Sequence, residues 1–268
     1  MGRLSGKVAV VTGALGLLGR QHCKALSEAG ATVVVGDLSE GECESFANAL
    51  QNETDSEAMG IHLDVTQPDS IVAARVRILE KFSRLDVLIN NAGVNEMVEQ
   101  HDSNLPWCFE NYPLALWDRS LAVNLTGVFL CSQVLGSFMA SQQSGSIVNI
   151  ASTYGIVAPD QSLYRKQDGA QSFFKSPAYS TTKGGIISFT RYLATYWGTK
   201  GVRVNCLTPG GVQNGQGSDF INAYSARTPI GKMARPWDYR AAIVFLASDA
   251  SSYMTGSNLI VDGGWTAW

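Results

Sequence analysis

Short hydrophobic runs alternate with longer amphipathic segments along most of the chain. Seven of these runs, rich in aliphatic residues, predict β-strands. They cover Val8–Thr12, Thr32–Val35, Met59–Leu63, Val87–Ile89, Ile147–Ala151, Val202–Leu207 and Asn258–Val261. Because none of them alternates cleanly between hydrophobic and polar positions, we expect both faces of each strand to be covered by other parts of the protein.

The segments between the runs predict helices over Leu17–Glu28, Ser70–Phe82, Trp117–Met139, Tyr179–Tyr196 and Trp237–Leu246. In the first helix Leu18, His22, Ala25 and Leu26 share one face, and Gly30 is placed to end it. Strand–helix alternation of this kind predicts a parallel sheet with helices on both sides. Since we find no linker and no repeat, we expect residues 1–268 to form a single doubly wound α/β domain of the Rossmann type, with a mostly parallel sheet of about seven strands.

The composition narrows the function. Hydrophobic residues make up 45% of the chain, charged residues 16%, and the net charge is −3, so we expect neither nucleic acid nor membrane as a partner. Five scattered cysteines without a CxxC pair indicate a reducing compartment, the cytoplasm, and no zinc site. We find no cluster of His, Asp and Glu in the sequence that would indicate a site for another metal. We also expect no signal peptide and no membrane span.

A glycine-rich turn joins the first predicted strand to the first predicted helix. In VVTGALGLLGR, Gly13, Gly16 and Gly19 are three residues apart. Glycines at such a turn allow the backbone to approach a pyrophosphate, and the helix N-terminus supplies N–H groups and a positive dipole end. The position of the turn therefore predicts a dinucleotide site.

An acidic residue, Asp37, follows the second strand. A carboxylate here can bind the adenosine ribose hydroxyls of NAD and would repel the extra phosphate of NADP. Its neighbours Leu15 and Leu38 are uncharged, and we find no Arg or Lys placed to neutralise that phosphate. We therefore expect NAD rather than NADP; the alternative interpretation is that Asp37 caps the strand end.

Tyr179 and Lys183 lie four residues apart in PAYSTTKGG, so they share one face of a helix. Taken alone, this pair is either a solvated surface pair or a functional one. Further motifs follow one another in the chain, namely LDVT, NNAG, VNLTG, NIASTYG, TPGGV and VDGGW. Together with TGALGLLG and YSTTK, they resemble the classical short-chain dehydrogenase/reductase family over nearly the whole sequence.

The resemblance implies which residues bind the cofactor. Asp37 would meet the ribose, Asp64 and Val65 would hold the adenine, and TPGGV would cover the nicotinamide. The full set that it implies is Thr12, Gly13, Gly16, Leu17, Gly19, Asp37, Asp64, Val65, Asn91, Ala92, Gly93, Tyr179, Lys183, Pro209, Gly210 and Val212.

The same resemblance implies four catalytic residues. Tyr179 would be the general acid/base, and Lys183 would favour its phenolate and hold the nicotinamide ribose. Ser152 would orient the reacting oxygen, and Asn124 would support a water that links Lys183 to solvent. Moving a phenol from its usual pKa near 10 to 7 takes roughly 4 kcal/mol, to which Lys183 and an oxidised nicotinamide would contribute. Alternatively, Ser152 caps a strand end and Asn124 is a satisfied polar residue.

Three features depart from the family pattern. The glycine turn has the TGxxGxxG spacing of extended members, such as sugar-nucleotide epimerases and dehydratases, but no further substrate domain follows the sixth strand. Asn214 stands where the family has a threonine that holds the nicotinamide carboxamide. Finally, Ser152 and Tyr179 are 27 positions apart, about twice the usual family spacing.

Two long loops, near residues 94–116 and 158–177, predict the substrate pocket and its lid. Arg165, Lys166 and Lys175 are candidates for a carboxylate or phosphate. Gln161, Tyr164, Gln171 and Asn95 are candidates for hydroxyls, a mixture that favours a polyol, sugar or sugar acid. The alternative is an ordinary solvated loop, and we interpret His101 as an exposed residue rather than a ligand.

The expected function is therefore NAD-dependent interconversion of a secondary alcohol and a ketone. The alternatives are an NADP-dependent carbonyl reductase, a sugar epimerase or dehydratase, and a non-catalytic dinucleotide-binding scaffold. The resemblance also implies a homotetramer or homodimer, in which Trp265 and Trp268 would lie at a subunit contact. Alternatively, these tryptophans pack on their own sheet.

Overall fold

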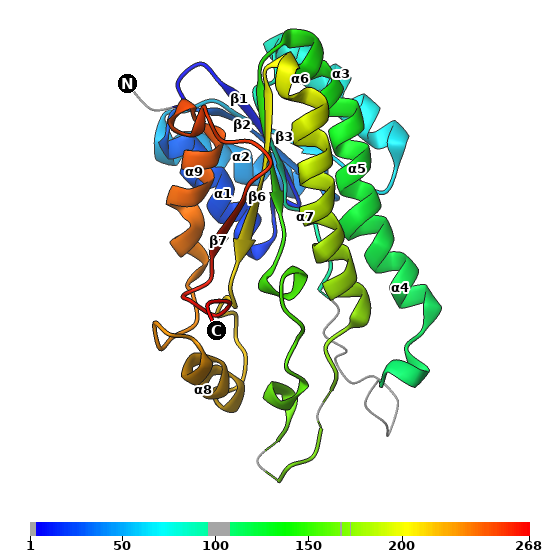
Figure 1. The fold of residues 1–268 in the computed structure, drawn as a ribbon. Coiled ribbons are helices and arrows are strands. Elements are labelled where there is room, and N and C mark those ends of the chain that lie inside the picture. The colour runs from blue at the N-terminus through cyan, green and yellow to red at the C-terminus, as the bar shows by residue number, and fades with distance from the viewer. Residues whose placement is uncertain (1–3, 96–107, 167, 172) are drawn as a thin grey trace.

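The computed structural model describes residues 4–95, 108–166, 168–171 and 173–268. Its centre is a sheet of seven parallel strands in the order β3-β2-β1-β4-β5-β6-β7 (Figure 1). The strands are β1 Val8–Thr12, β2 Thr32–Asp37, β3 Ala58–His62, β4 Val87–Asn90, β5 Gly145–Ile150, β6 Val202–Pro209 and β7 Asn258–Val261. This confirms the predicted doubly wound α/β fold.

Helices cover both faces of the sheet (Figure 1). One face carries α1 (Leu17–Glu28), α2 (Glu40–Thr54) and α9 (Arg240–Ala247), whose hydrophobic side chains form one core with the sheet. The other face carries α3 (Pro68–Phe82), α7 (Pro177–Trp197) and a long helix that comprises α4 (Leu114–Leu121), α5 (Gly127–Cys131) and α6 (Ser137–Gln142). Strands enclosed in this way explain the hydrophobic runs without polar alternation.

Two helices were not expected from the sequence. In α2 the buried positions Cys43, Phe46, Ala47 and Leu50 follow helical spacing, so a signal was present. The other is α8 (Ser218–Arg227), in which the only buried residue is Tyr224, and this leaves little pattern to detect. The last predicted helix begins later than expected, since Pro236–Tyr239 is a 3₁₀ turn that precedes α9.

The helix from Leu114 to Gln142 is longer than predicted and contains π-helical turns at Ala122–Thr126 and Ser132–Gly136. By length and composition alone it could cross a membrane, contrary to the sequence-based expectation. In this fold it packs against α3 and α7. Its apolar character is also what a helix on the core of such a sheet requires.

The carboxyl ends of the parallel strands all lie at one edge of the sheet. Strand order reverses between β1 and β4, and a ligand site is expected beyond such a reversal. Residues 158–166 and α8 extend beyond this same edge, at the bottom of Figure 1. The fold therefore brings the glycine turn, the YxxxK helix and one of the two predicted loops to a common end of the molecule.

Candidate active site

The glycine turn after β1 has the geometry of a tight phosphate-binding turn. Gly13 has φ +60°, and a Cβ added to it would lie 2.6 Å from the Ala92 Cα, so a side chain there would force β1 and β4 apart. Gly16 is the N-cap residue of α1 and Gly19 lies in the first turn. Among the described residues no side chain caps this helix, so its first N–H groups remain available to an anion.

Hydrogen bonds tie this turn to the end of β4. The Thr12 hydroxyl accepts from the backbone N–H groups of Asn91 (3.1 Å) and Ala92 (3.0 Å). In return the Asn91 amide donates to the carbonyls of Thr12 (3.0 Å) and Gly13 (2.8 Å). The NNAG motif thus shapes the floor of the predicted dinucleotide site through contacts within the protein.

Asp37 lies at the end of β2 beside the glycine turn. Its half-buried carboxylate accepts from the backbone N–H of Leu15 at 2.9 Å and of Leu38 at 2.8 Å. The Arg20 Nε donates to the Leu15 carbonyl at 2.9 Å, and its guanidinium stacks over Phe46, 4.7 Å from the ring centroid. That no Arg or Lys neutralises a 2′-phosphate here stays a prediction.

The end of β3 supplies the third part of the predicted cofactor site. The Asp64 carboxylate accepts from the Thr66 N–H (2.9 Å) and hydroxyl (2.7 Å), and Val65 is buried. The glycine turn after β1, the acidic residue at the end of β2 and the apolar Val65 after β3 thus lie along the carboxyl edge of the sheet. A dinucleotide fits this arrangement: free helix N–H groups for its phosphates, a carboxylate for its ribose and an apolar side chain for its adenine.

The four predicted catalytic residues converge at the end of β5. A hydrogen bond links Ser152, directly after β5, to Tyr179 near the start of α7. The Lys183 Nζ lies 5.7 Å from the Tyr179 ring centroid and donates to the Ile150 carbonyl at 2.8 Å. A Cβ added to Gly155 would lie 2.6 Å from the Lys183 carbonyl carbon, so this glycine allows the β5 end and α7 to approach closely.

Asn124 lies in the first π-helical turn of the long helix. Its Oδ1 accepts from the Val94 N–H (2.7 Å) and its Nδ2 donates to the Val94 carbonyl (2.9 Å). The amide therefore fixes the backbone just after NNAG. A Cβ added to Gly93 would lie 3.3 Å from Asn124 Oδ1 and 3.6 Å from Lys183 Nζ, which places Asn124 close to Lys183. A water relay between them stays a prediction.

Burial changes the proton affinities of both groups in the YxxxK pair. It lowers the pKa of Lys183 to about 8, because an ammonium is disfavoured away from water. Burial also raises the pKa of the Tyr179 phenol, and the hydrogen bond with Ser152 opposes this. Lys183 by itself therefore does not bring the phenol toward neutrality, and the expected lowering stays a prediction for the complex with the oxidised cofactor.

A cavity of about 490 Å³ connects the two halves of the site. It reaches from Leu17 of the glycine turn past Ser152 and Tyr179 to the loop residues Arg165 and Lys175. The turn after β6 lines it with Pro209, Gly210, Gly211, Val212 and Asn214. Asn214 thus lines the cavity, and its predicted place near the nicotinamide stays a prediction.

Several loop residues expected to meet substrate instead bind the loop itself. The Gln171 amide donates to the carbonyls of Gln161 and Phe173, both at 2.8 Å, and Gln161 Oε1 accepts from the Lys175 N–H at 2.8 Å. The Tyr164 hydroxyl lies 3.1 Å from that of Tyr154. Most of the predicted lid near 94–116, with His101, lies outside the described residues.

Sequence reasoning missed an aromatic cluster that closes the far end of the cavity. Tyr224 of α8 stacks on Trp265 with ring centroids 4.0 Å apart, and Phe220 stacks on Tyr164 at 5.5 Å. Trp265 is thus buried against Tyr224 of α8, whereas Trp268 is 80% exposed. A subunit contact at these tryptophans stays a prediction. The cluster joins residues about 40 to 60 positions apart, so no local pattern could reveal it.

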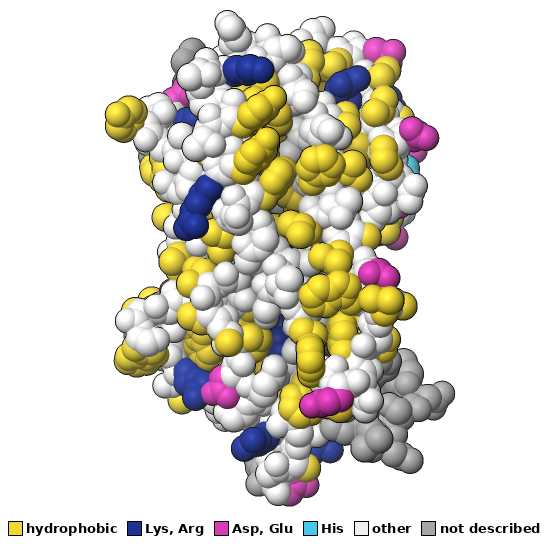
Figure 2. Space-filling model, turned by 45° about the vertical axis from the view of Figure 1, so that its right-hand side comes forward, with side chains coloured by type: hydrophobic (Ala, Val, Ile, Leu, Met, Phe, Trp, Pro, Cys, Tyr) yellow, Lys and Arg dark blue, Asp and Glu magenta, His cyan; other side chains and the backbone are white. Residues whose placement is uncertain are grey.

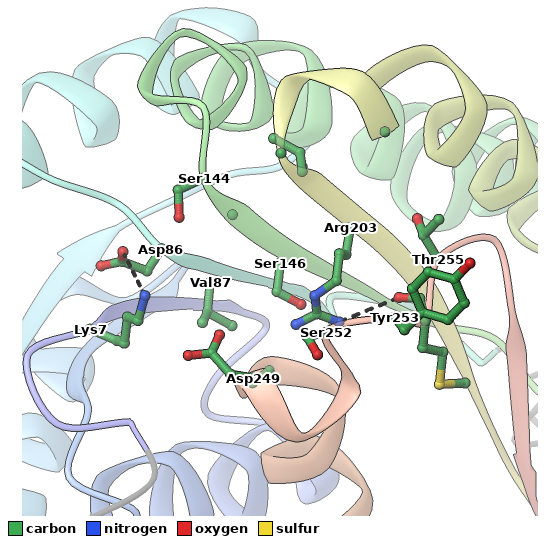
Figure 3. A pocket seen from close by; sticks show the side chains of 16 residues that line it. Lys7, Asp86, Val87, Ser144, Ser146, Arg203, Asp249, Ser252, Tyr253 and Thr255 are labelled. Atoms are coloured by element: carbon green, nitrogen blue, oxygen red, sulfur yellow. Dashed lines mark hydrogen bonds and ion pairs between the residues drawn. The ribbon is translucent and has the colours of Figure 1, made fainter.

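A larger cavity, about 560 Å³, lies at the opposite edge of the sheet (Figure 3). Its charged groups bind one another or the backbone: Asp86 pairs with Lys7 and Arg84, and Arg203 donates to the carbonyls of Leu246 and Ser248 that end α9. This cavity therefore has a structural explanation, and the smaller one contains the candidate chemistry.

A dinucleotide-binding fold with a Ser–Tyr–Lys set at the carboxyl edge of its parallel sheet defines an NAD(P)-dependent dehydrogenase or reductase. Comparison with known proteins agrees. A family model described as enoyl-(acyl carrier protein) reductase matches residues 13–266. The chain belongs to the short-chain dehydrogenase/reductase family and is an oxidoreductase of secondary alcohols.

Three similar proteins illustrate the range of the family. The cis-4-hydroxycyclohexanecarboxylate dehydrogenase of Sinomonas cyclohexanicum is 37% identical over 97% of each chain. The D-threitol dehydrogenase of Mycolicibacterium smegmatis is 35% identical over 98% of this chain and 94% of its own. A gluconate 5-dehydrogenase of Burkholderia cenocepacia, solved with NADP and tartrate, has a TM-score of 0.87 and 27% identity over 99% of this chain and 97% of its own.

Proposed function

We propose that this protein is an NAD-dependent dehydrogenase that oxidises a secondary alcohol of a sugar, polyol or hydroxy acid. The observation that carries the proposal is the cavity itself, which has Leu17 and Leu18 of the glycine-turn segment at one end and Ser152 and Tyr179 on its wall, with Lys183 beside Tyr179. NAD is favoured because the Asp37 carboxylate, at the end of β2 beside the glycine turn, would repel the extra phosphate of NADP. Because the cation Arg20 also contacts the glycine turn, the preference for NAD over NADP should be measured directly.

The residues divide the work of the reaction. The Ser152 hydroxyl donates to the substrate oxygen and orients it, and the Tyr179 phenolate takes the proton of the alcohol. Lys183 stabilises the phenolate through its positive charge, and Asn124 fixes the backbone beside it. NAD, which the glycine turn and Asp37 would hold, would supply the acceptor for the hydride of the carbinol carbon. The protein thus supplies geometry and proton handling for a transfer between two bound molecules.

The relatives support a polar substrate. Names among them include a hydroxycyclohexanecarboxylate, threitol and gluconate, each a hydroxylated compound. The cavity contains hydroxyl and amide groups next to aromatic rings, so it suits a molecule with polar groups on a compact carbon skeleton.

The direct test is NADH formation by the purified protein with a panel of polyols, aldonic acids, hydroxycyclohexanecarboxylates and a hydroxysteroid, with NADP in parallel. We expect turnover of a polar alcohol with NAD, and none in Tyr179→Phe. Tight NAD binding without turnover of any alcohol would overturn the proposal. That result would favour the epimerase or scaffold alternatives, in which NAD stays bound without net oxidation.

We further propose that the protein is a homo-oligomer, with the face of α4–α7 as the subunit contact. Phe129, Tyr192 and Tyr196 are 43%, 61% and 57% exposed on this face. Figure 2 shows hydrophobic side chains distributed over it. Exposed apolar groups at this density are expected at an interface. Sedimentation equilibrium with Tyr192→Glu against the native chain tests it: a tetramer or dimer should dissociate, and a native monomer would refute it.

A further inference from the structure

A second lysine flanks the catalytic tyrosine on the side opposite to Lys183. Helix α7 begins at Pro177, and the Ser176 hydroxyl caps it by accepting from the Tyr179 N–H at 3.3 Å. Lys175 therefore precedes the cap residue and stands four positions before Tyr179, as Lys183 stands four positions after it. The Lys175 N–H donates to Gln161 Oε1 at 2.8 Å, so the backbone here is fixed on both sides.

The ammonium of Lys175 is buried in the cavity. The residue is 6% exposed, and its Nζ lies 4.4 Å from the Tyr179 ring centroid and 5.9 Å from that of Tyr154. Its one hydrogen-bond acceptor in the described chain is the neutral Oδ1 of Asn95. No carboxylate of the described residues pairs with it, although an ammonium has three donors and is costly to bury without an opposite charge.

The other cations around the cavity are arranged differently. Arg165 and Lys166 are exposed at its rim, and Arg165 Nε donates to Gln171. Arg227 pairs with Asp160. Lys175 therefore differs from them in combining burial, an incomplete set of partners and direct proximity to the reacting group. Beyond it the cavity wall is apolar, formed by Leu163, Phe173, Phe220 and Met233.

We propose that Lys175 is the specificity-determining residue that binds a carboxylate of the substrate, so that the alcohols oxidised are hydroxy acids. The acid group would complete the hydrogen bonds of the buried ammonium, and the apolar wall would contact the carbon skeleton. This inference rests on the proposed dehydrogenase function, which it narrows from polar alcohols in general to those that carry an anionic group.

A binding experiment tests the inference without catalysis. Cyclohexanecarboxylate has no hydroxyl to oxidise, and cyclohexanecarboxamide is its neutral counterpart of nearly equal shape. We expect calorimetry on the NAD-saturated protein to show that the acid binds about 10- to 100-fold more tightly than the amide. Lys175→Met should remove this preference, whereas Lys200→Met, at an exposed lysine of the 3₁₀ turn after α7, should keep it. Equal affinities in the native protein, or no binding of the acid, would overturn the inference.

Kinetic measurements distinguish binding of the substrate carboxylate by Lys175 from an effect of Lys175 on the reactivity of Tyr179. For a hydroxy acid, Lys175→Met should raise KM about 10- to 100-fold, and for the matching neutral diol it should change neither KM nor kcat more than about threefold. Lys175→Arg should raise the KM less than Lys175→Met does, because it keeps a positive charge at this position. If Lys175→Met instead lowers kcat for both substrates equally, Lys175 acts on Tyr179, and the carboxylate assignment is wrong. If Lys166→Met has the larger effect on KM, the assignment is also wrong.

The two proposals fail in different ways. If neutral alcohols are oxidised and acids are not preferred, the dehydrogenase function stands and the role of Lys175 falls. If no alcohol of either kind is oxidised, both fall. A further readout is pH: burial lowers the pKa of Lys175 to about 8, and within the described ranges the titratable groups whose rings its ammonium faces are the phenols of Tyr154 and Tyr179. Acid binding should weaken as pH rises through 8 in the native chain but not in Lys175→Arg.

Discussion

The two ends of the cavity are built in different ways. At the cofactor end, backbone groups at strand ends bind one another directly or through Thr12 and Asn91, residues that belong to short motifs. At the substrate end, the side-chain amides of Gln161 and Gln171 bind the backbone of the segment between β5 and α7, and Phe220 of α8 stacks on Tyr164. Strand ends that the sheet aligns build the first end, whereas side chains from a loop and from α8, outside the sheet, build the second.

Tyr179 stands where the two ends meet, so its removal should have the largest effect. We expect Tyr179→Phe to lower kcat about 10³-fold, because the phenol that takes the alcohol proton in the proposed reaction is lost. The affinity for NAD should change little, since the ring and Lys183 remain. Stopped-flow rates and calorimetric NAD binding measure the two quantities.

Tyr253→Phe, at a fully exposed tyrosine at the opposite edge of the sheet, is the matched control and should keep the native rate. A Tyr179→Phe rate within about tenfold of the native one would mean that another residue or a water performs the proton transfer.

A change at the cofactor end should affect the choice of dinucleotide and leave the substrate end unchanged. We expect Asp37→Asn to lower the ratio of kcat/KM for NAD over NADP about 10- to 100-fold, since a charged hydrogen-bond acceptor for the ribose is lost. Asp69→Asn, an exposed acid in the first turn of α3, is the control. An unchanged ratio would refute the role of Asp37, and a native preference for NADP would point to Arg20 as the dominant charge.

A change at the substrate end should affect the binding of the alcohol and leave the binding of NAD unchanged. We expect Gln171→Leu to raise the KM for the alcohol about 3- to 10-fold, because the loop loses the two hydrogen bonds that the Gln171 amide donates, to the Gln161 and Phe173 carbonyls. The KM for NAD should stay within about twofold. Gln133→Leu, at an exposed position of the long helix, controls for the loss of an amide. An equal effect on both KM values would show that the loop supports the whole site and not only the substrate end.

The same contrast explains what the sequence could predict. All seven strands followed from hydrophobic runs and turn residues, because parallel strands buried on both faces leave a strong local signal. The topology then placed strand-end residues such as Asp37 at one edge, whereas the assignment of Ser152, Tyr179 and Lys183 to one site came from the resemblance of their motifs to the family.

Other features required the three-dimensional structure. The sequence marked Lys175 as a candidate for an anion, but not that it is buried against Tyr179, because its surroundings come from Asn95, Tyr154 and Gln161. The π-helical turn that presents Asn124 leaves no pattern in the residue types. Likewise, the rise in the Tyr179 pKa through burial depends on packing that no spacing of residues reveals.

A substitution of His22, on α1 at the cofactor end, should change the stability of the fold rather than the chemistry of the site. It lies on the predicted inner face of α1, fully buried, and among the described residues neither ring nitrogen has a hydrogen-bond partner. Burial lowers its pKa from 6.5 to about 3. The unfolded chain therefore takes up a proton at His22 near pH 6.5, whereas the folded protein does so only near pH 3. This difference destabilises the fold as pH falls below 6.5.

We expect His22→Leu to stabilise the protein by about 1 kcal/mol at pH 7.5, because an unsatisfied polar ring gives way to an apolar side chain of similar size. The gain should grow by about 2 kcal/mol between pH 6.5 and pH 5, at roughly 1.4 kcal/mol per pH unit. Urea unfolding at these pH values measures it, with the exposed His62→Gln as the control. A gain that does not depend on pH would mean that His22 is already protonated in the folded protein, and that a polar group or water reaches it beside the dinucleotide helix.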